Sequence, residues 1–127
     1  MLVRITVNVL RIAALIALIL GLIFWTSPTR GVLVPIHMLL GIIVTLTLLI
    51  LGGVMVTVKN GLGLGIGAIV LGLLVVIVGL TQTQLIPGSL HWIIQVIHLL
   101  IGLTAIGMGE MVAGRYRRTM AAAKIAQ

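Results

Sequence analysis

The sequence predicts an all-α membrane protein: a bundle of four transmembrane helices running up, down, up and down, built as two weakly similar helical pairs. First, 61% of the 127 residues are hydrophobic and only 7% are charged, which leaves too little polar side chain to cover a surface facing water. Second, four apolar stretches are each long enough to cross about 30 Å of hydrocarbon at a rise of about 1.5 Å per residue. Third, the connections between them are short, so successive helices should be antiparallel neighbours in one domain.

The four expected helices cover residues 5–25, 34–58, 62–80 and 90–112, and a basic tail covers 115–127. The first stretch resembles a signal peptide but lacks a small-residue cleavage site, so we interpret it as a retained signal-anchor helix. Turn-forming residues separate the helices: Pro28 and Gly31 in the first connection, Lys59-Asn60-Gly61 in the second and Pro87-Gly88 in the third.

The distribution of basic residues predicts the orientation. Seven of the eight are expected on one side, and only Arg30 on the other; the seven are Arg4, Arg11, Lys59, Arg115, Arg117, Arg118 and Lys124. Because Lys and Arg concentrate in cytoplasmic loops, both termini should be cytoplasmic in a multi-pass protein of a prokaryotic plasma membrane. The net charge of +7 does not predict nucleic-acid binding, because aromatic residues are only 3% of the chain and no basic run is interleaved with them.

A short repeat contains two of the three histidines. Ile36-His37 and Ile97-His98 are each followed by three apolar residues and a glycine, Gly41 in one case and Gly102 in the other. An ionisable residue inside a membrane is a candidate functional residue, because burying it without a partner is costly. Two histidines on facing helices can bind one haem iron from both sides, with the glycines one turn away leaving space for the macrocycle. The alternative is a pair of histidines hydrogen-bonded across the helices.

His91 is a rival to His98 as the second ligand. Counting residues to the nearest cytoplasmic charge places His37 and His91 at similar depths, whereas the repeat favours His98. Arg30, on the outer side, is expected near the haem propionates. Gly65, Gly72 and Gly79 form a smooth stripe that helix packing alone would explain, and Gly21 could flank the haem. The one acidic residue, Glu110, is expected in an interfacial ion pair near Arg115 and Arg117.

At the two Ile-His-x-x-x-Gly segments the chain resembles small four-helix b-type membrane cytochromes, and also a related family of uncharacterised bacterial four-helix membrane proteins. The resemblance extends from Leu18 to Arg118 but depends chiefly on His37, Gly41, His98 and Gly102. It implies one haem b held by two histidines, and electron transfer with quinol or a partner redox protein. Two-haem relatives carry further histidines that this chain lacks.

The leading hypothesis is therefore a membrane electron-transfer protein or respiratory-chain subunit that binds one haem b between the second and fourth helices near the outer face. His37 and His98 would be the metal ligands, and Gly41, Gly102, His91 and Arg30 would line the cofactor site. No catalytic residue is predicted, and the expected partners are lipid, a quinone, and other subunits of a membrane complex or a second copy. The alternatives are a non-catalytic accessory subunit of a respiratory or photosynthetic complex, and a carrier using its histidines for protons or metal.

Overall fold

In the computed structural model, which describes residues 1–26 and 31–125, every regular element is a helix. The long helices are α1 (Leu2–Thr26), α2 (Leu33–Val56), α3 (Leu62–Thr81) and α4 (His91–Ile125), and a 3-10 turn, η1 (Gly88–Leu90), precedes α4. All four are long and apolar enough to cross a membrane. The prediction of four apolar helices is confirmed, and it suggests a multi-pass membrane protein.

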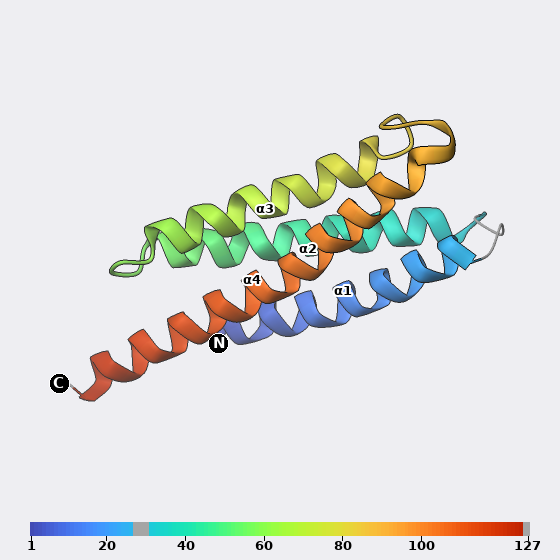
Figure 1. Cartoon of the computed structure of the whole chain (residues 1–127). Helices are drawn as coiled ribbons and strands as arrows, with labels where there is room; N and C mark the ends of the chain where they lie inside the picture. The colour runs from blue at the N-terminus through green and yellow to red at the C-terminus, as the bar shows by residue number, and fades with distance from the viewer. Residues whose placement is uncertain (27–30, 126–127) are drawn as a thin grey trace.

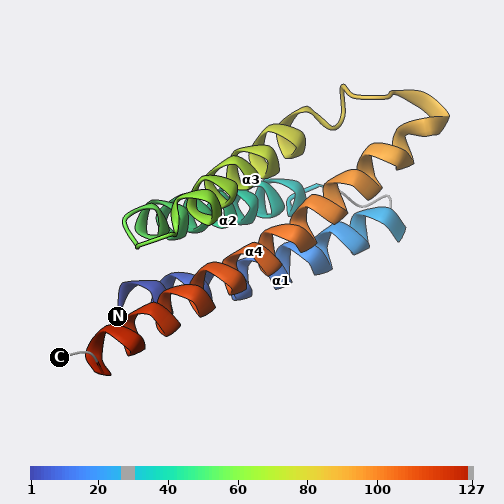
Figure 2. The same cartoon turned by 60° about the vertical axis from the view of Figure 1, so that its left-hand side comes forward.

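Each helix packs beside the helices that precede and follow it in the chain, and α4 also packs beside α1 (Figure 1). α2 contacts α1 and α3, and α4 contacts α1 and α3 as well. α2 also reaches α4 across the bundle, whereas α1 and α3 make no contact over the residues that the structure describes. Figure 2 shows α2 beside α3, and α1 beside α4. The N-terminus, the α2–α3 turn and the C-terminal part of α4 lie toward one end, which we call the basic end; η1 lies at the other, which we call the histidine end.

Close contact between α2 and α3 depends on glycine. A side-chain carbon on Gly52 would lie 2.7 Å from the carbonyl oxygen of Gly65, and one on Gly65 would lie 2.7 Å from the carbonyl oxygen of Gly52. About two helical turns away along the same interface, the Thr45 hydroxyl donates a hydrogen bond of 3.0 Å to the carbonyl oxygen of Gly72. Small residues that let helix backbones approach are the usual basis of helix association in membranes, where lipid removes the hydrophobic driving force.

The interior is apolar along most of the bundle, and Leu10, Leu48, Leu51 and Met55 are fully buried. The outer surface is apolar too, since many leucine and isoleucine side chains of all four helices point outward. A large exposed apolar surface on every side is unfavourable in water but suits contact with lipid tails.

The fourth helix is longer than expected. The helix was predicted to span residues 90–112, and the basic tail 115–127 was expected to be an amphipathic helix end near the lipid surface; α4 continues without a break from His91 to Ile125. After Gly114 the sequence holds no further glycine or proline, and its Ala, Arg, Lys and Met residues all favour helix. The basic tail is therefore the last part of α4.

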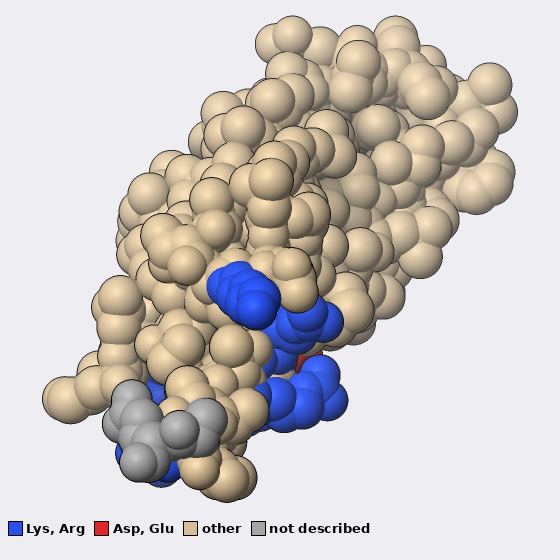
Figure 3. Space-filling view, turned by 90° about the vertical axis from the view of Figure 1, so that its left-hand side faces the viewer, with Lys and Arg blue, Asp and Glu red and all other residues tan. Residues whose placement is uncertain are grey.

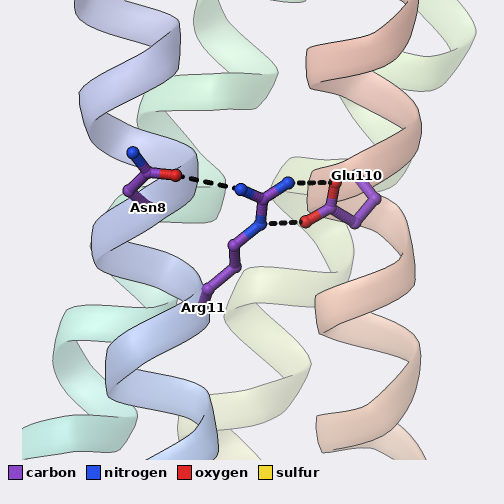
Figure 4. Close-up of polar contacts among 3 residues, drawn as sticks. All are labelled: Asn8, Arg11 and Glu110. Carbon is purple, nitrogen blue, oxygen red and sulfur yellow. Dashed lines mark hydrogen bonds and ion pairs between the residues drawn. The ribbon is translucent and has the colours of Figure 1, made fainter.

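The partner of Glu110 also differs from the prediction. Glu110 forms an ion pair with Arg11 of α1, through Nε–Oε1 and Nη2–Oε2 distances of 2.5 and 2.7 Å (Figure 4). Asn8 accepts a third hydrogen bond from Arg11 at 3.0 Å. Arg115 lies five residues after Glu110, and at 3.6 residues per turn it points to another side of α4, whereas Arg117 acts on Glu110 electrostatically. The expected ion pair therefore forms, but its hydrogen-bonded partner comes from α1 and connects α1 to α4.

Candidate functional site

A cavity of about 500 Å³ opens toward the histidine end of the bundle, and all four helices contribute to its wall. A volume of this size is typical of cofactor and small-molecule sites. Most of the lining is aliphatic, with a few polar side chains gathered near one end. The histidine repeat lies on it, since the lining includes His37, Gly41, His98 and Gly102.

His37 of α2 and His98 of α4 meet across this cavity. Their ring centroids are 6.1 Å apart, and the ring planes are inclined by 63°. Two metal–nitrogen bonds of about 2 Å each, on opposite sides of one ion, would place two imidazole centroids about 6 Å apart. An edge-to-face ring pair can have the same separation, so the surroundings of the two rings must distinguish these arrangements.

The ring nitrogens do not separate these arrangements. Nδ1 of His37 and Nδ1 of His98 are both buried, and neither has a hydrogen-bond partner among the described residues. The backbone carbonyl of Ala17 lies close to the His37 ring, but no well-formed hydrogen bond joins it to Nδ1. An imidazole that binds a metal through Nε2 still has an Nδ1 atom that needs a partner, so the same atoms lack partners in either arrangement.

The glycines around the two rings show where the cavity has room for a ligand and where it does not. A side-chain carbon on Gly41 or on Gly102 would meet no atom within 4 Å, so there is open space one turn from each histidine. Gly21 of α1 and Gly79 of α3 instead touch the rings: their added carbons would lie 3.6 Å from Cε1 of His37 and 3.3 Å from Cε1 of His98. The two histidines are therefore confined at their sides by α1 and α3, with free volume along the bundle axis.

The glycine stripe of α3 divides between two roles. Gly65 and Gly72 pack against α2, as expected for helix packing, whereas Gly79 leaves room for His98. One side of α4 faces inward at i, i+4, i+7 spacing: His91, Gln95, His98 and Gly102 line the cavity, and Ala105 and Gly109 are buried below it.

Phe24 is a site residue that sequence reasoning missed. Its ring meets His37 edge-on, with centroids 5.5 Å apart and planes inclined by 69°, and it lines the cavity. Phe24 is the one phenylalanine in the chain, near the end of the first apolar stretch. An aromatic residue at this position could have been noted as a candidate cavity residue, but its contact with His37 could not be predicted from the sequence.

Polar residues gather where the cavity opens. His91, Gln95, Gln82 and Thr83 line this part. His91 thus shares the cavity with the other two histidines, although the ring that pairs with His37 belongs to His98. Arg30, expected near the propionates, lies outside the described residues.

Over residues 1–26 and 31–125, no group of three or more His, Cys, Asp or Glu side chains could hold a metal ion. Comparison with protein-family models, curated proteins and solved structures finds no match to this chain. Its function must be inferred from its own residues.

Proposed function

We propose that this chain is a membrane electron-transfer protein, or a subunit of one, that binds a single haem b between α2 and α4. In this proposal the four helices cross a prokaryotic plasma membrane up, down, up and down, with both termini and the basic end on the cytoplasmic side. The distribution of Lys and Arg supports that orientation. The haem site then lies toward the outer face.

One observation supports the proposal above the others: two half-buried histidines from different helices line one cofactor-sized cavity, with ring centroids at a separation that suits two ligands of one metal ion. The open space at Gly41 and Gly102 supports it further. A haem held by the two imidazoles would fill this free volume.

In the proposed site His37 and His98 would hold the haem iron. Gly41 and Gly102 would leave room for the macrocycle, and Phe24 packs edge-on against the His37 ring. Bound haem would supply a one-electron redox centre. The aliphatic lining excludes water from it, and the polar residues at the mouth, with Arg30, are candidates to face the propionates or a quinone.

The proposal is tested by measuring the haem content of purified protein expressed with an adequate haem supply. The wild-type chain should carry one haem per chain, and His37→Ala and His98→Ala should each lose most of it. His91→Ala is the comparison variant, because it removes a histidine of the same cavity whose ring does not pair with His37; it should keep clearly more haem than either ligand variant. Equal haem content in all four proteins would contradict the assignment.

Partners of the chain are part of the proposal. A larger respiratory or photosynthetic complex, or a second copy, would contact the outward-facing apolar surface of the bundle. An accessory subunit without any cofactor is the alternative, and the haem measurement separates the two. Co-purification in mild detergent would then identify the assembly, and a lone monomer would count against a complex.

A further inference from the structure

A second hollow lies at the basic end, far along the chain from the histidines. It measures about 560 Å³ and lies between the α2–α3 turn and the C-terminal part of α4; its lining comprises Lys59, Asn60, Arg115, Arg118, Thr119 and Ala122. Figure 3 shows that Lys and Arg side chains gather on this end of the molecule. None of these residues belongs to the haem proposal.

Helical spacing explains why α4 presents cations to this hollow. Arg118 and Thr119 each lie three or four residues from both Arg115 and Ala122, so the four residues share one face of the helix. Arg117 lies off that face and acts electrostatically on Glu110 instead. Lys59 and Asn60 reach the hollow from the turn, where Asn60 has a left-handed backbone with φ of 59°.

The cations of the hollow have no acidic side chain to pair with. The chain contains a single Asp or Glu, and both carboxylate oxygens of that residue, Glu110, are hydrogen-bonded to Arg11. Lys59, Arg115 and Arg118 therefore gather around one hollow with no acidic side chain in the protein to balance them. Like charges that converge in this way are stabilised by an anion from outside.

The position of the hollow along the bundle axis, relative to the hydrocarbon core, indicates the source of that anion. α4 has 35 residues, which makes it about 52 Å long, and the hydrocarbon core is about 30 Å thick. Its basic C-terminal turns and the α2–α3 turn therefore reach the headgroup level on one side. Basic pockets between transmembrane helices at this level are typical phospholipid headgroup sites.

We infer that this hollow binds the phosphate group of an anionic phospholipid. The ammonium group of Lys59 and the guanidinium groups of Arg115 and Arg118 would pair with phosphate oxygens, and charge-assisted hydrogen bonds of this kind are the stronger ones. The Asn60 amide is a further donor. The Thr119 hydroxyl is already used, since it donates to the carbonyl oxygen of Arg115 at 3.1 Å.

The test compares two triple variants of the full chain in a neutral detergent. One is Lys59→Gln/Arg115→Gln/Arg118→Gln; the control is Arg4→Gln/Arg117→Gln/Lys124→Gln, which lowers the net charge of +7 by the same three units without touching the hollow. Native mass spectrometry measures binding of phosphatidylglycerol, phosphatidylcholine and inorganic phosphate. Circular dichroism verifies that both variants keep their helices, and the single Arg118→Gln variant repeats the test with a smaller change.

The wild type and the control should bind phosphatidylglycerol in preference to phosphatidylcholine. Each basic residue near a membrane surface contributes about fivefold in affinity, so we expect the single variant to bind about fivefold more weakly and the site variant at least tenfold more weakly. Equal weakening of both triple variants would overturn the site in favour of a diffuse charge effect. Binding of inorganic phosphate as tight as that of the lipid would overturn the assignment to a lipid. Neither result would affect the haem measurement, which reads a different end of the molecule.

Discussion

A methyl carbon on Gly79 would lie 3.3 Å from Cε1 of His98, so α3 and α4 meet at this glycine with almost no space for a side chain. Gly79 therefore determines where the His98 ring can sit relative to His37. We expect Gly79→Ala to shift the ring by a few tenths of an ångström and to weaken haem binding by about tenfold, as the loss of residues that orient a metal ligand typically does. Titration of the apo-protein with haem measures this. Gly63→Ala is the control on the same helix, because a side chain there meets no atom within 4 Å.

Filling the cavity should exclude haem without unfolding the bundle. Gly41→Leu and Gly102→Leu place side chains in open space that the proposed haem would occupy. We expect each variant to keep its helical circular dichroism and to lose most of its haem. Gly53→Leu and Gly107→Leu are matched controls on the same two helices, since both positions are exposed and open and neither lines the cavity. Full haem content in the cavity variants would show that the space is not the haem site.

The contact between Gly52 and Gly65 should dominate the stability of the α2–α3 pair. A methyl group on Gly65 would lie 2.7 Å from the carbonyl oxygen of Gly52 and 2.6 Å from Cγ2 of Val56. Because backbone atoms cannot move aside cheaply, Gly65→Ala should lower the free energy of unfolding by about 1–3 kcal/mol, the usual cost of overpacking. Unfolding in a denaturing detergent measures the change. A variant as stable as Gly63→Ala would contradict this close approach.

The ion pair between Arg11 and Glu110 should behave as one unit. Arg11→Gln and Glu110→Gln each leave a charge without its partner, so each should lower the unfolding midpoint. The double variant should be no less stable than the worse single variant, because the second substitution removes the charge left behind. Additive losses in the thermal unfolding of the four proteins would mean that the two side chains act independently.

Hydropathy and helix length were enough to predict the four apolar helices, because each segment had to supply about 20 apolar residues without help from the others. The end of α4 was harder to place. Its last part is polar, and the predicted span ended where hydropathy falls, at residue 112. The residues beyond it, including Arg115 and Lys124, have high helix propensity, so the helix continues to Ile125.

The sequence identified the histidines of the candidate site but not the residues that contact them. The repeat identified His37 and His98, and the depth count left His91 open because it assumed that α2 and α4 share one tilt. The contact of Gly79 with His98 and that of Phe24 with His37 depend on how neighbouring helices rotate. The pairing of Arg11 with Glu110 joins residues 99 positions apart. No periodicity along a single helix carries that information.

The central claim is that one iron-bearing macrocycle lies between His37 and His98. The reduced-minus-oxidised absorption spectrum of the purified wild-type chain tests it most directly. The wild-type protein should show a Soret band and an α band of a b-type haem with two histidine ligands, and the His37→Ala/His98→Ala double variant should show neither. A featureless wild-type spectrum after haem supplementation, or unchanged bands in the double variant, would contradict it.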